Sequence, residues 1–401
     1  MKTYSLRPDE SAPRPAREPD GAPSDAAEAL LGGLNPVQAE AARTTEGAVM
    51  IVAGPGSGKT RTLTHRIAYL IESRKAWPSQ ILALTFTNRA AQEMRARVTD
   101  LVGPEAKSMW MGTFHSVFSR VLRREAEKIG FTRDFSIYDT DDTERLIREL
   151  MTRYGIDSKK VTPRAVRTRI SGAKNQMVTP SEYLRIANDP FELAVAKLYG
   201  PYVDALRAAN AMDFDDLLGW PIRLFEGHPE VLADYQQRWR YVHIDEYQDT
   251  NRAQYVLAKL LAAKHKNICV VGDDAQSIYA FRGADIQNIL SFQKDYPEAR
   301  TVRLEQNYRS TQRIVRLADA IIKTNRDQLK KELWTDNDEG DPVVLMESLS
   351  ERDEAQKIER TLRDAHARVG LGWKDAAVLY RTNAQSRSIE EALRRGGIPY
   401  R

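Results

Sequence analysis

Val49-Met50-Ile51-Val52-Ala53-Gly54-Pro55-Gly56-Ser57-Gly58-Lys59-Thr60 is the stretch that decides the fold: an apolar β-type run passes into a glycine-rich loop. The loop ends in the Gly-Lys-Thr of the phosphate-loop pattern G-x-x-x-x-G-K-[ST]. Glycines let backbone N–H groups converge on an anion, Lys59 can reach the outer phosphates, and the Thr60 hydroxyl can bind Mg²⁺. A helix expected to begin here adds its positive dipole end. A chance glycine-rich turn would not need these flanks, so the stretch predicts a nucleoside triphosphate site.

Bulk composition sets the class of protein. A chain of 401 residues with 42% hydrophobic content can form two or three domains with real cores. Lys and Arg (60) barely exceed Asp and Glu (56), so a polyanionic partner must be argued from local patches. The single cysteine, Cys269, excludes an internal disulfide framework, and its apolar neighbours indicate core packing rather than a nucleophile. With no bilayer-length apolar run and no signal segment, we expect a soluble, cytoplasmic protein without a membrane partner.

The strand and helix pattern predicts an interrupted α/β domain. We expect a disordered tail over residues 1–30, rich in Pro, Ala and charge, before Asn35 caps and Pro36 starts the first helix. Buried strands are predicted within residues 81–87, 108–116, 241–249 and 269–284. The rhythm stops over 116–207, which we interpret as a wholly helical insertion. The predicted domains are an α/β domain of residues 31–115 and 208–300, and a second, incomplete one over 301–401 that begins a sheet at 343–346 and 377–380.

Polar and aromatic side chains follow several of these strands. Open parallel sheets bind ligands at the carboxyl ends of their strands. Phe86 follows one strand and His115 another, although a lone histidine is more often structural. The strand of residues 241–244 delivers Asp245 and Glu246; in a nucleotide-hydrolysing site the first acid holds Mg²⁺ and the second polarises the attacking water. Asp-Glu pairs commonly cap helices, so this signal gains its weight from the phosphate loop.

Two later segments add candidate nucleotide and base contacts. Gln276 can sense a γ-phosphate or orient water, whereas Tyr279 and Phe281 offer flat faces for base stacking, worth about 1–3 kcal/mol per base, or pack in the core. Tyr308 and Arg309 could stack on a purine and reach a phosphate.

A basic run lies in the predicted insertion. Residues 151–180 carry seven basic side chains against one acid, Asp157. Such a run is usually a solvated face, but it can also contact a phosphate backbone without reading sequence.

Taken together, these motifs resemble the ordered motif set of the UvrD/Rep/PcrA group, superfamily 1 DNA helicases that move 3′ to 5′. The resemblance covers roughly residues 34–400 and is carried by Gln38, 54–60, 84–94, 113–116, 245–249, 270–284, 304–310 and 381–387. It implies a P-loop, RecA-like parallel-sheet domain with an all-helical insertion, plus the start of a second RecA-like domain, with ATP bound between the two.

The resemblance also implies roles for individual residues. Lys59, Asp245, Glu246, Gln276 and Arg309 are the implied catalytic group, with Glu246 as general base and Gln276 and Arg309 at the γ-phosphate. Thr60 and Asp245 would hold Mg²⁺. ATP would be bound by Gln38, which reads the adenine, Tyr308, which stacks on it, Arg61, Arg309 and the loop Gly54, Pro55, Gly56, Ser57, Gly58, Lys59 and Thr60. Single-stranded DNA would be handled by Phe86, Asn88, His115, Phe214, Tyr279, Phe281 and Asn383.

Departures from the family pattern are few. Pro55 stands where relatives often carry a small residue, and Phe281 replaces a frequent tryptophan. Asp274-Ala275 differs from the residues usual in the family at these positions, although Gln276 is retained. The sequence ends at Arg401, about where the family inserts its second accessory domain, so we expect the later motifs, including an arginine of the ATP site, to lie outside it.

Three functions follow from these predictions. The first is an ATP-dependent 3′–5′ DNA helicase or translocase acting on single-stranded DNA and single-strand/duplex junctions, in repair or replication restart. The second is the helicase half of a helicase-nuclease. The third is a nucleotide- and DNA-binding module with little turnover.

Overall fold

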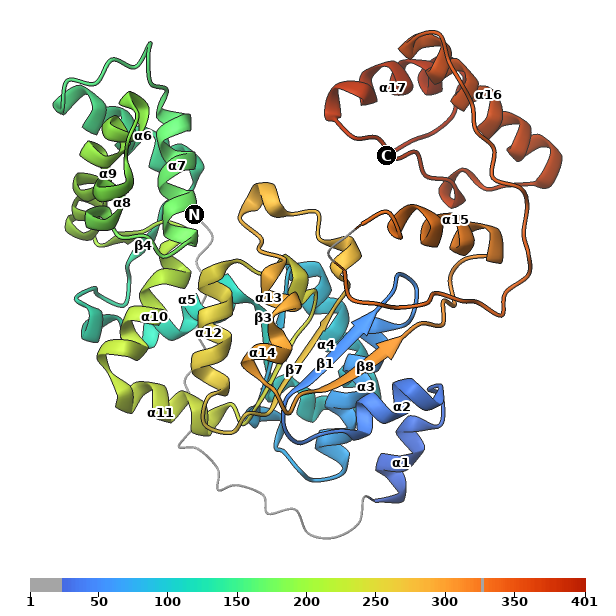
Figure 1. Cartoon of the computed structure of the whole chain (residues 1–401), viewed down its shortest axis with the longest axis horizontal. Coiled ribbons are helices and arrows are strands. Elements are labelled where there is room, and N and C mark those ends of the chain that lie inside the picture. Colours follow the sequence, from blue (N-terminus) through green and yellow to red (C-terminus); the bar gives the residue numbers. More distant parts are fainter. Residues whose placement is uncertain (1–23, 326–327) are drawn as a thin grey trace. The chain divides into compact units, whose positions relative to one another are not determined.

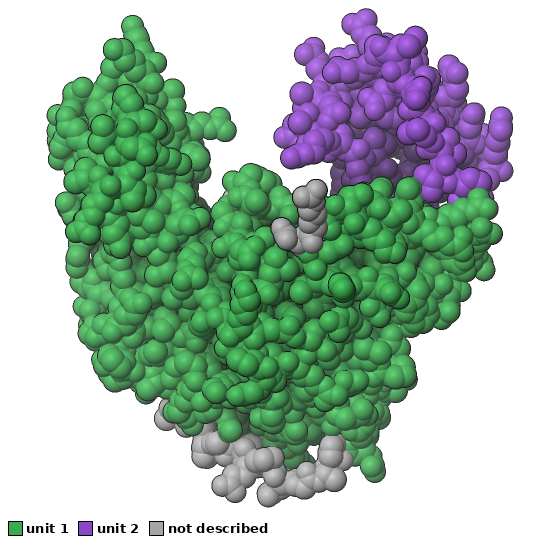
Figure 2. Space-filling view, viewed as in Figure 1, with its two compact units in different colours: residues 1–339 green, residues 340–401 purple. Residues whose placement is uncertain are grey.

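The computed structural model describes residues 24–325 and 328–401. The chain divides into two compact units, residues 1–339 and 340–401 (Figure 2). Of the predicted tail, residues 1–23 lie outside the described part. The prediction is wrong for its end, because helix α1 (Asp25–Leu31) forms with Ser24 as its N-cap. Its Ala27 and Leu31 are buried against Tyr69, and this apolar contact is what holds the segment in place.

A six-stranded sheet forms the centre of unit 1 (Figure 1). All neighbouring strands run parallel, in the order β3-β2-β6-β7-β1-β8. Their bounds are β1 Val49–Ala53, β2 Ile81–Thr85, β3 Trp110–Thr113, β6 Tyr241–Ile244, β7 Ile268–Gly272 and β8 Arg300–Leu304. The predicted α/β parallel sheet is therefore confirmed. Parallel orientation brings the carboxyl ends of all six strands to one edge, where the candidate site lies.

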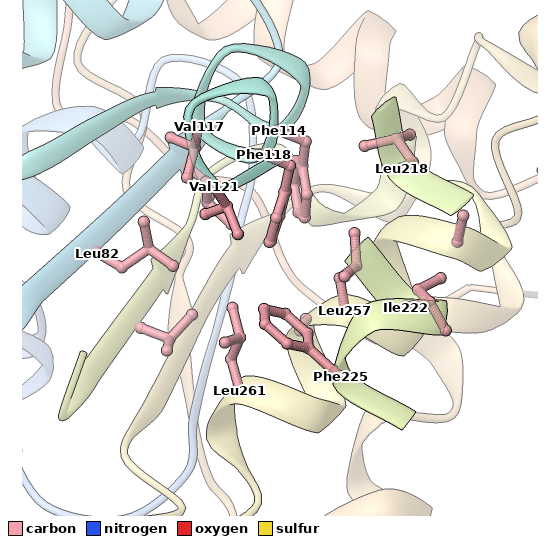
Figure 3. Packing of buried hydrophobic residues seen from close by; sticks show 14 of the residues in the cluster. Leu82, Phe114, Val117, Phe118, Val121, Leu218, Ile222, Phe225, Leu257 and Leu261 are labelled. Atoms are coloured by element: carbon pink, nitrogen blue, oxygen red, sulfur yellow. The ribbon is translucent and has the colours of Figure 1, made fainter. Parts of the chain in front are cut away.

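Helices cover both faces of this sheet. Along β1, Val49 and Ile51 pack with helices α2, α3 and α4 on one face, whereas Met50 and Val52 pack on the other, as the two-residue period of a strand requires. Figure 3 shows the second face, where Leu82 lies near helices α5, α10 and α12. The bounds are α2 Pro36–Arg43, α3 Lys59–Glu72, α4 Asn88–Val102, α5 Phe114–Glu125, α10 Asp216–Gly227, α11 Pro229–Arg238, α12 Arg252–Ala262, α13 Gln287–Leu290 and α14 Phe292–Asp295. Each fully buried side chain such as Leu82 contributes about 1.5–3 kcal/mol. Cys269, buried in β7, packs on the same face of the sheet as Val49 and Ile51, in the core as predicted.

The helical insertion has a core of its own. Leu150, Val166, Leu198 and Tyr202 meet at its centre. Its helices are α6 Thr140–Arg153, α7 Pro163–Asn175, α8 Pro180–Ile186 and α9 Pro190–Ala208. The predicted limits of 116–207 and the wholly helical content are wrong in two respects. Helix α5 packs in the main core, and β4 (Ser136–Ile137) pairs in parallel with β5 (Ala211–Met212) where the chain enters and leaves the insertion.

Strand β8 alters the expected division at residue 301. It adjoins β1 along its whole length, from Val49 opposite Arg300 to Ala53 opposite Leu304. Helix α15 (Gln312–Ile322) follows, and residues up to Glu339 stay within unit 1. The sequence alone does not indicate this, because the strand pattern of β8 fits either sheet.

Unit 2 contains helices α16 (Glu351–Val369) and α17 (Ser386–Arg395), which pack through Ala355, Ile389 and Leu393. The predicted strands at 343–346 and 377–380 are not strands in the structure. A strand needs a neighbour to satisfy its backbone groups, and the described part of unit 2 provides none. Leu345 and Leu379 are accordingly 88% and 93% exposed. Across the described residues, we find no helix with the length and apolarity to cross a bilayer.

Candidate functional site

The phosphate loop connects β1 to α3. Ala53, the last residue of β1, occupies the first glycine position of the motif, and Gly56 and Gly58 have φ of 67° and 85°. Such left-handed backbone favours glycine. Gly58 is the N-cap of α3 and supplies no side-chain cap, so the N–H groups of the first turn remain available to an anion. The loop thus has the geometry of a phosphate cradle.

Lys59 and Glu246 meet at the start of α3. Lys59 Nζ lies 3.1 Å from Glu246 Oε2. Glu246 is the second residue after β6 and has a φ of 51°, a strained value for a residue with a side chain. Such strain concentrates at functional sites. Burial, and then the neighbouring Glu246 carboxylate, raise the pKa of Asp245 to about 7, while Lys59 acts in the opposite direction. The buried Asp245 carboxylate therefore favours an additional cation beside it.

A hydrogen-bond relay extends from this pair to β7. Gln248 Nε2 donates to Glu246 Oε2 at 3.0 Å, and Gln248 Oε1 accepts from the Asp273 backbone N–H at 3.0 Å. Asp273 Oδ2 then accepts from Gln276 Nε2 at 2.7 Å. Gln248 and Asp273 were not predicted as site residues. Gly272 lies beside this relay: a Cβ there would be 2.6 Å from Gln248 Oε1, so a larger residue would displace the Gln248 side chain.

The segment after β8 lies against the phosphate loop. Asn307 Nδ2 donates to the Pro55 carbonyl at 2.6 Å, and the Tyr308 N–H donates to the Gly56 carbonyl at 2.9 Å. A Cβ at Gly56 would be 2.7 Å from Arg309 Cβ. The structure therefore brings Tyr308 and Arg309 to the loop, although roughly 250 residues separate them from it in the sequence.

Gln38 approaches the loop from the other end. Its Nε2 donates to the Ser57 carbonyl at 2.9 Å, and its Oε1 accepts from the Asn35 N–H in a capping box. Asn35 Nδ2 in turn donates to the Tyr308 hydroxyl at 2.7 Å. Arg61, on α3, donates to the Gly33 carbonyl at 2.7 Å. Gln38 and Tyr308 are thus linked through Asn35, which the sequence indicated only as a helix cap.

The donor set suits magnesium better than a softer metal. Within residues 24–325 and 328–401, no group of three or more His, Cys, Asp and Glu side chains is placed to hold a metal ion. Thr60 and Asp245 offer hard oxygen atoms, and Mg²⁺ is typically held by one or two protein ligands together with phosphates and water. The residues present therefore fit Mg²⁺ delivered with a nucleotide.

Comparison with known proteins now identifies the family. Residues 34–297 match the UvrD/REP helicase N-terminal domain, and residues 302–401 match the UvrD-like helicase C-terminal domain. The chain belongs to the UvrD/REP helicase family.

Individual relatives agree with this assignment. The chain is 51% identical over 372 residues to the ATP-dependent DNA helicase PcrA of Staphylococcus aureus, an alignment that covers 93% of this chain and 51% of that protein. It is 52% identical to PcrA of Staphylococcus epidermidis over the same shares of each chain. The chain thus spans about half the length of the curated relatives that it matches. The predicted family resemblance is confirmed.

Five of the seven residues that the UvrD/REP resemblance assigned to DNA form two aromatic groups in unit 1. The Phe86 and Tyr279 ring centroids are 4.8 Å apart, with Phe281 5.9 Å beyond Tyr279. His115 and Phe214 lie edge to face at 6.2 Å. Phe281 is 75% exposed, which argues against core packing for this residue. Burial lowers the pKa of His115, so this ring stays neutral near pH 7.

Two further predicted DNA contacts lie outside these groups. Asn88 is exposed at the first position of α4, whose N-cap is Thr87. Asn383 is exposed at the start of a short 3₁₀ helix in unit 2.

The basic run of the insertion divides into two classes. Lys174 is buried between Asp213 and Asp216, Arg167 pairs with Glu144, and Arg169 pairs with Glu192. These three side chains each have a carboxylate partner within unit 1. The remaining four are exposed and retain the charge that a polyanion could meet: Arg153, Lys159, Lys160 and Arg164.

Proposed function

We propose that this chain binds ATP with Mg²⁺ and supplies the nucleotide site of a 3′–5′ DNA helicase or translocase that acts on single-stranded DNA and on junctions with duplex. The observation that carries the proposal is the contact between Lys59 of the phosphate loop and Glu246 at the end of β6. This pair places a phosphate-binding cation and a candidate base within one hydrogen bond. Service in repair or replication restart, in the cytoplasm, is part of the same proposal.

Each group at the sheet edge has a role in this scheme. The backbone N–H groups of the loop and Lys59 bind the β- and γ-phosphates, and Glu246 accepts a proton from the attacking water. Mg²⁺, held by Thr60 and Asp245, would supply neutralisation of the phosphate charge. Gln276 and Arg309 contact the γ-phosphate, while Gln38 and Tyr308 contact the adenine. Lys59 pairs with Glu246 in the structure, and a phosphate group would offer Lys59 a second partner.

The aromatic groups handle DNA in this proposal. Phe281 and Phe214, which are 75% and 54% exposed, present ring faces on which bases can stack. Stacking on aromatic rings is tolerant of sequence, as translocation along any strand requires. Phe86, Asn88, His115, Tyr279 and Asn383 complete the proposed DNA contacts.

Substitution of Lys59 tests the proposal. We expect Lys59→Ala to abolish DNA-stimulated ATP hydrolysis. The same change should weaken binding of a fluorescent ATP analogue with Mg²⁺ by at least tenfold. Lys323→Ala is the control, because this lysine is 65% exposed and pairs with Asp319 of helix α15. Turnover and affinity that are equal in Lys59→Ala and wild type would refute the nucleotide-site assignment.

The two other functions predict different results. A binding module without turnover would bind the analogue but hydrolyse no ATP in the presence of single-stranded DNA, whereas a helicase site would show DNA-stimulated hydrolysis. The helicase half of a helicase-nuclease shares every feature described above. DNA cleavage that accompanies DNA-stimulated ATP hydrolysis would distinguish it.

A further inference from the structure

Lys331 is a buried cation that no motif assigns. Its side chain is 4% exposed, and its Nζ lies 2.7 Å from Asp273 Oδ1 and 2.6 Å from Asp274 Oδ1. The two acids are themselves 0% and 1% exposed, and Asp274 Oδ2 also accepts from the Leu329 N–H at 2.9 Å. An ion cluster so thoroughly removed from water is costly unless its geometry is fully satisfied.

The residues around Lys331 are held on the sheet edge from both sides. The Trp334 N–H donates to the Glu305 carbonyl at 3.2 Å, and the Asn307 N–H donates to the Trp334 carbonyl at 2.7 Å. Leu333 lies against Gly54 of the phosphate loop. Lys331 therefore belongs to a segment, residues 329–334, that is fixed to the phosphate loop and to β8, and not to a loose surface loop.

Asp273 connects Lys331 to the nucleotide site through hydrogen bonds. One carboxylate oxygen receives Lys331, and the other accepts from Gln276 Nε2 at 2.7 Å. The Asp273 N–H donates to Gln248, whose amide donates to Glu246 Oε2 at 3.0 Å. The orientations of Gln276 and of the Glu246 carboxylate therefore both depend on the position of Asp273.

Charge explains why the lysine is needed for that position. Without it, two adjacent carboxylates would be buried with no cation, and like charges at that distance repel strongly in a poorly solvated site. Burial lowers the pKa of Lys331, but Asp273 and Asp274 outweigh this and raise it above its ordinary value, so the side chain stays protonated. Asp273 can then keep one oxygen free to orient Gln276.

We propose that Lys331 is a positioning residue for γ-phosphate recognition. It holds Asp273 in place, and Asp273 in turn orients Gln276 and Gln248. The inference rests on the proposed function, because it assumes that Gln276 faces the γ-phosphate. It adds a residue outside the motifs and gives residues 329–334 a part in distinguishing ATP from ADP.

The test compares nucleotides and does not require turnover. Affinities of this chain for ATPγS and for ADP, both with Mg²⁺, are measured by calorimetry. We expect Lys331→Met to weaken ATPγS binding about tenfold or more, the size of a lost hydrogen bond to a charged group, and to leave ADP binding within about threefold. Lys331→Arg should recover most of the loss. Lys323→Met is the matched control, since Lys323 is 65% exposed and pairs with Asp319.

A double variant separates positioning from charge balance. Lys331→Met combined with Asp274→Asn restores the net charge of the buried cluster while Asp273 still lacks its cation. If Lys331 positions Asp273, ATPγS binding stays weak although thermal stability recovers. If the lysine only balances charge, both recover and the inference is overturned. The double variant also serves as the test should Lys331→Met fail to fold.

The remaining outcomes distinguish this inference from the proposed function. Unchanged discrimination between ATPγS and ADP in Lys331→Met, with a wild type that discriminates, overturns the inference alone. A wild type that binds neither nucleotide in a Lys59-dependent manner overturns both.

Discussion

Replacing Lys174 by methionine should destabilise the chain more than any other single change of a lysine in the insertion. Lys174 Nζ lies 2.7 Å from both Asp213 Oδ2 and Asp216 Oδ1, and the three side chains are 8%, 8% and 15% exposed. The Tyr202 hydroxyl also donates to Asp213 at 2.8 Å. This cluster joins α7 of the insertion to the start of α10, so its loss affects the junction between the insertion and the rest of unit 1.

The magnitude follows from the burial of the acids. Removing one partner of a buried ion pair costs about 3–5 kcal/mol, because the other charge remains in a poorly solvated site. Burial already raises the pKa of Asp216 to about 6, with Lys174 opposing that shift. Without Lys174 this acid takes up a proton at neutral pH, which limits the cost to the lower end, about 3 kcal/mol. That is a large share of the 5–15 kcal/mol typical of a folded domain.

Urea unfolding, followed by circular dichroism, measures the effect. With a denaturant slope of about 3 kcal/mol per molar, the midpoint should fall by about 1 M. Lys160→Met is the control, because this lysine of the same insertion is exposed. Lys174→Met combined with Asp216→Asn should recover part of the loss. A midpoint for Lys174→Met within about 0.2 M of the control, less than 1 kcal/mol by the same slope, would refute the reasoning.

Two further predictions concern the loop and the acid cluster. Gly56→Ala should raise the dissociation constant for ATP about tenfold or more. A Cβ at this position would lie 2.7 Å from Arg309 Cβ, and the left-handed backbone would add about 1–2 kcal/mol of strain. Gly47→Ala is the control, because Gly47 has a φ of 77° but no atom within 4 Å of an added Cβ, and equal ATP affinities in the two variants would contradict the prediction. Burial, followed by Asp213, raises the pKa of Asp215 to about 6, so the folded chain binds this proton more tightly than the unfolded chain and loses up to about 3 kcal/mol as pH rises from 4 to above 6. Asp215→Asn should flatten that slope when unfolding midpoints are compared at pH 4.5 and 7, and an unchanged slope would show that another group is responsible.

Local sequence was sufficient for five strands of the sheet in unit 1, β1, β2, β3, β6 and β7, but not for β8. Val49–Ala53 and Ile268–Gly272 are apolar throughout, because strands buried on both faces show no alternation, and each is followed by the polar residues of the site. The same reading was wrong for 343–346 and 377–380, where the apolar runs have no strand partner in the described residues. Strand formation there depends on a neighbour, and residue pattern contains no information about one.

The site could be predicted where chemistry is concentrated in a motif. Lys59 and Glu246 belong to motifs whose residue types reveal their purpose, and the structure brings them within 3.1 Å. Gln248 and Lys331 were missed, because each contributes through a hydrogen bond to a residue distant in sequence. A glutamine and a lysine are ordinary surface residues until the fold buries them, as it does here.

The position of β1 between β7 and β8 has a consequence for biosynthesis. Both neighbours of this apolar strand are encoded more than two hundred codons downstream, so a ribosome that adds about 5–20 residues per second leaves its edges uncovered for roughly 10–40 s. During that interval the unpaired backbone N–H and C=O groups of the strand can pair with another chain, which favours aggregation. We therefore expect chaperones that bind short aliphatic segments to bind Val49–Ala53, the strand that later leads into the phosphate loop.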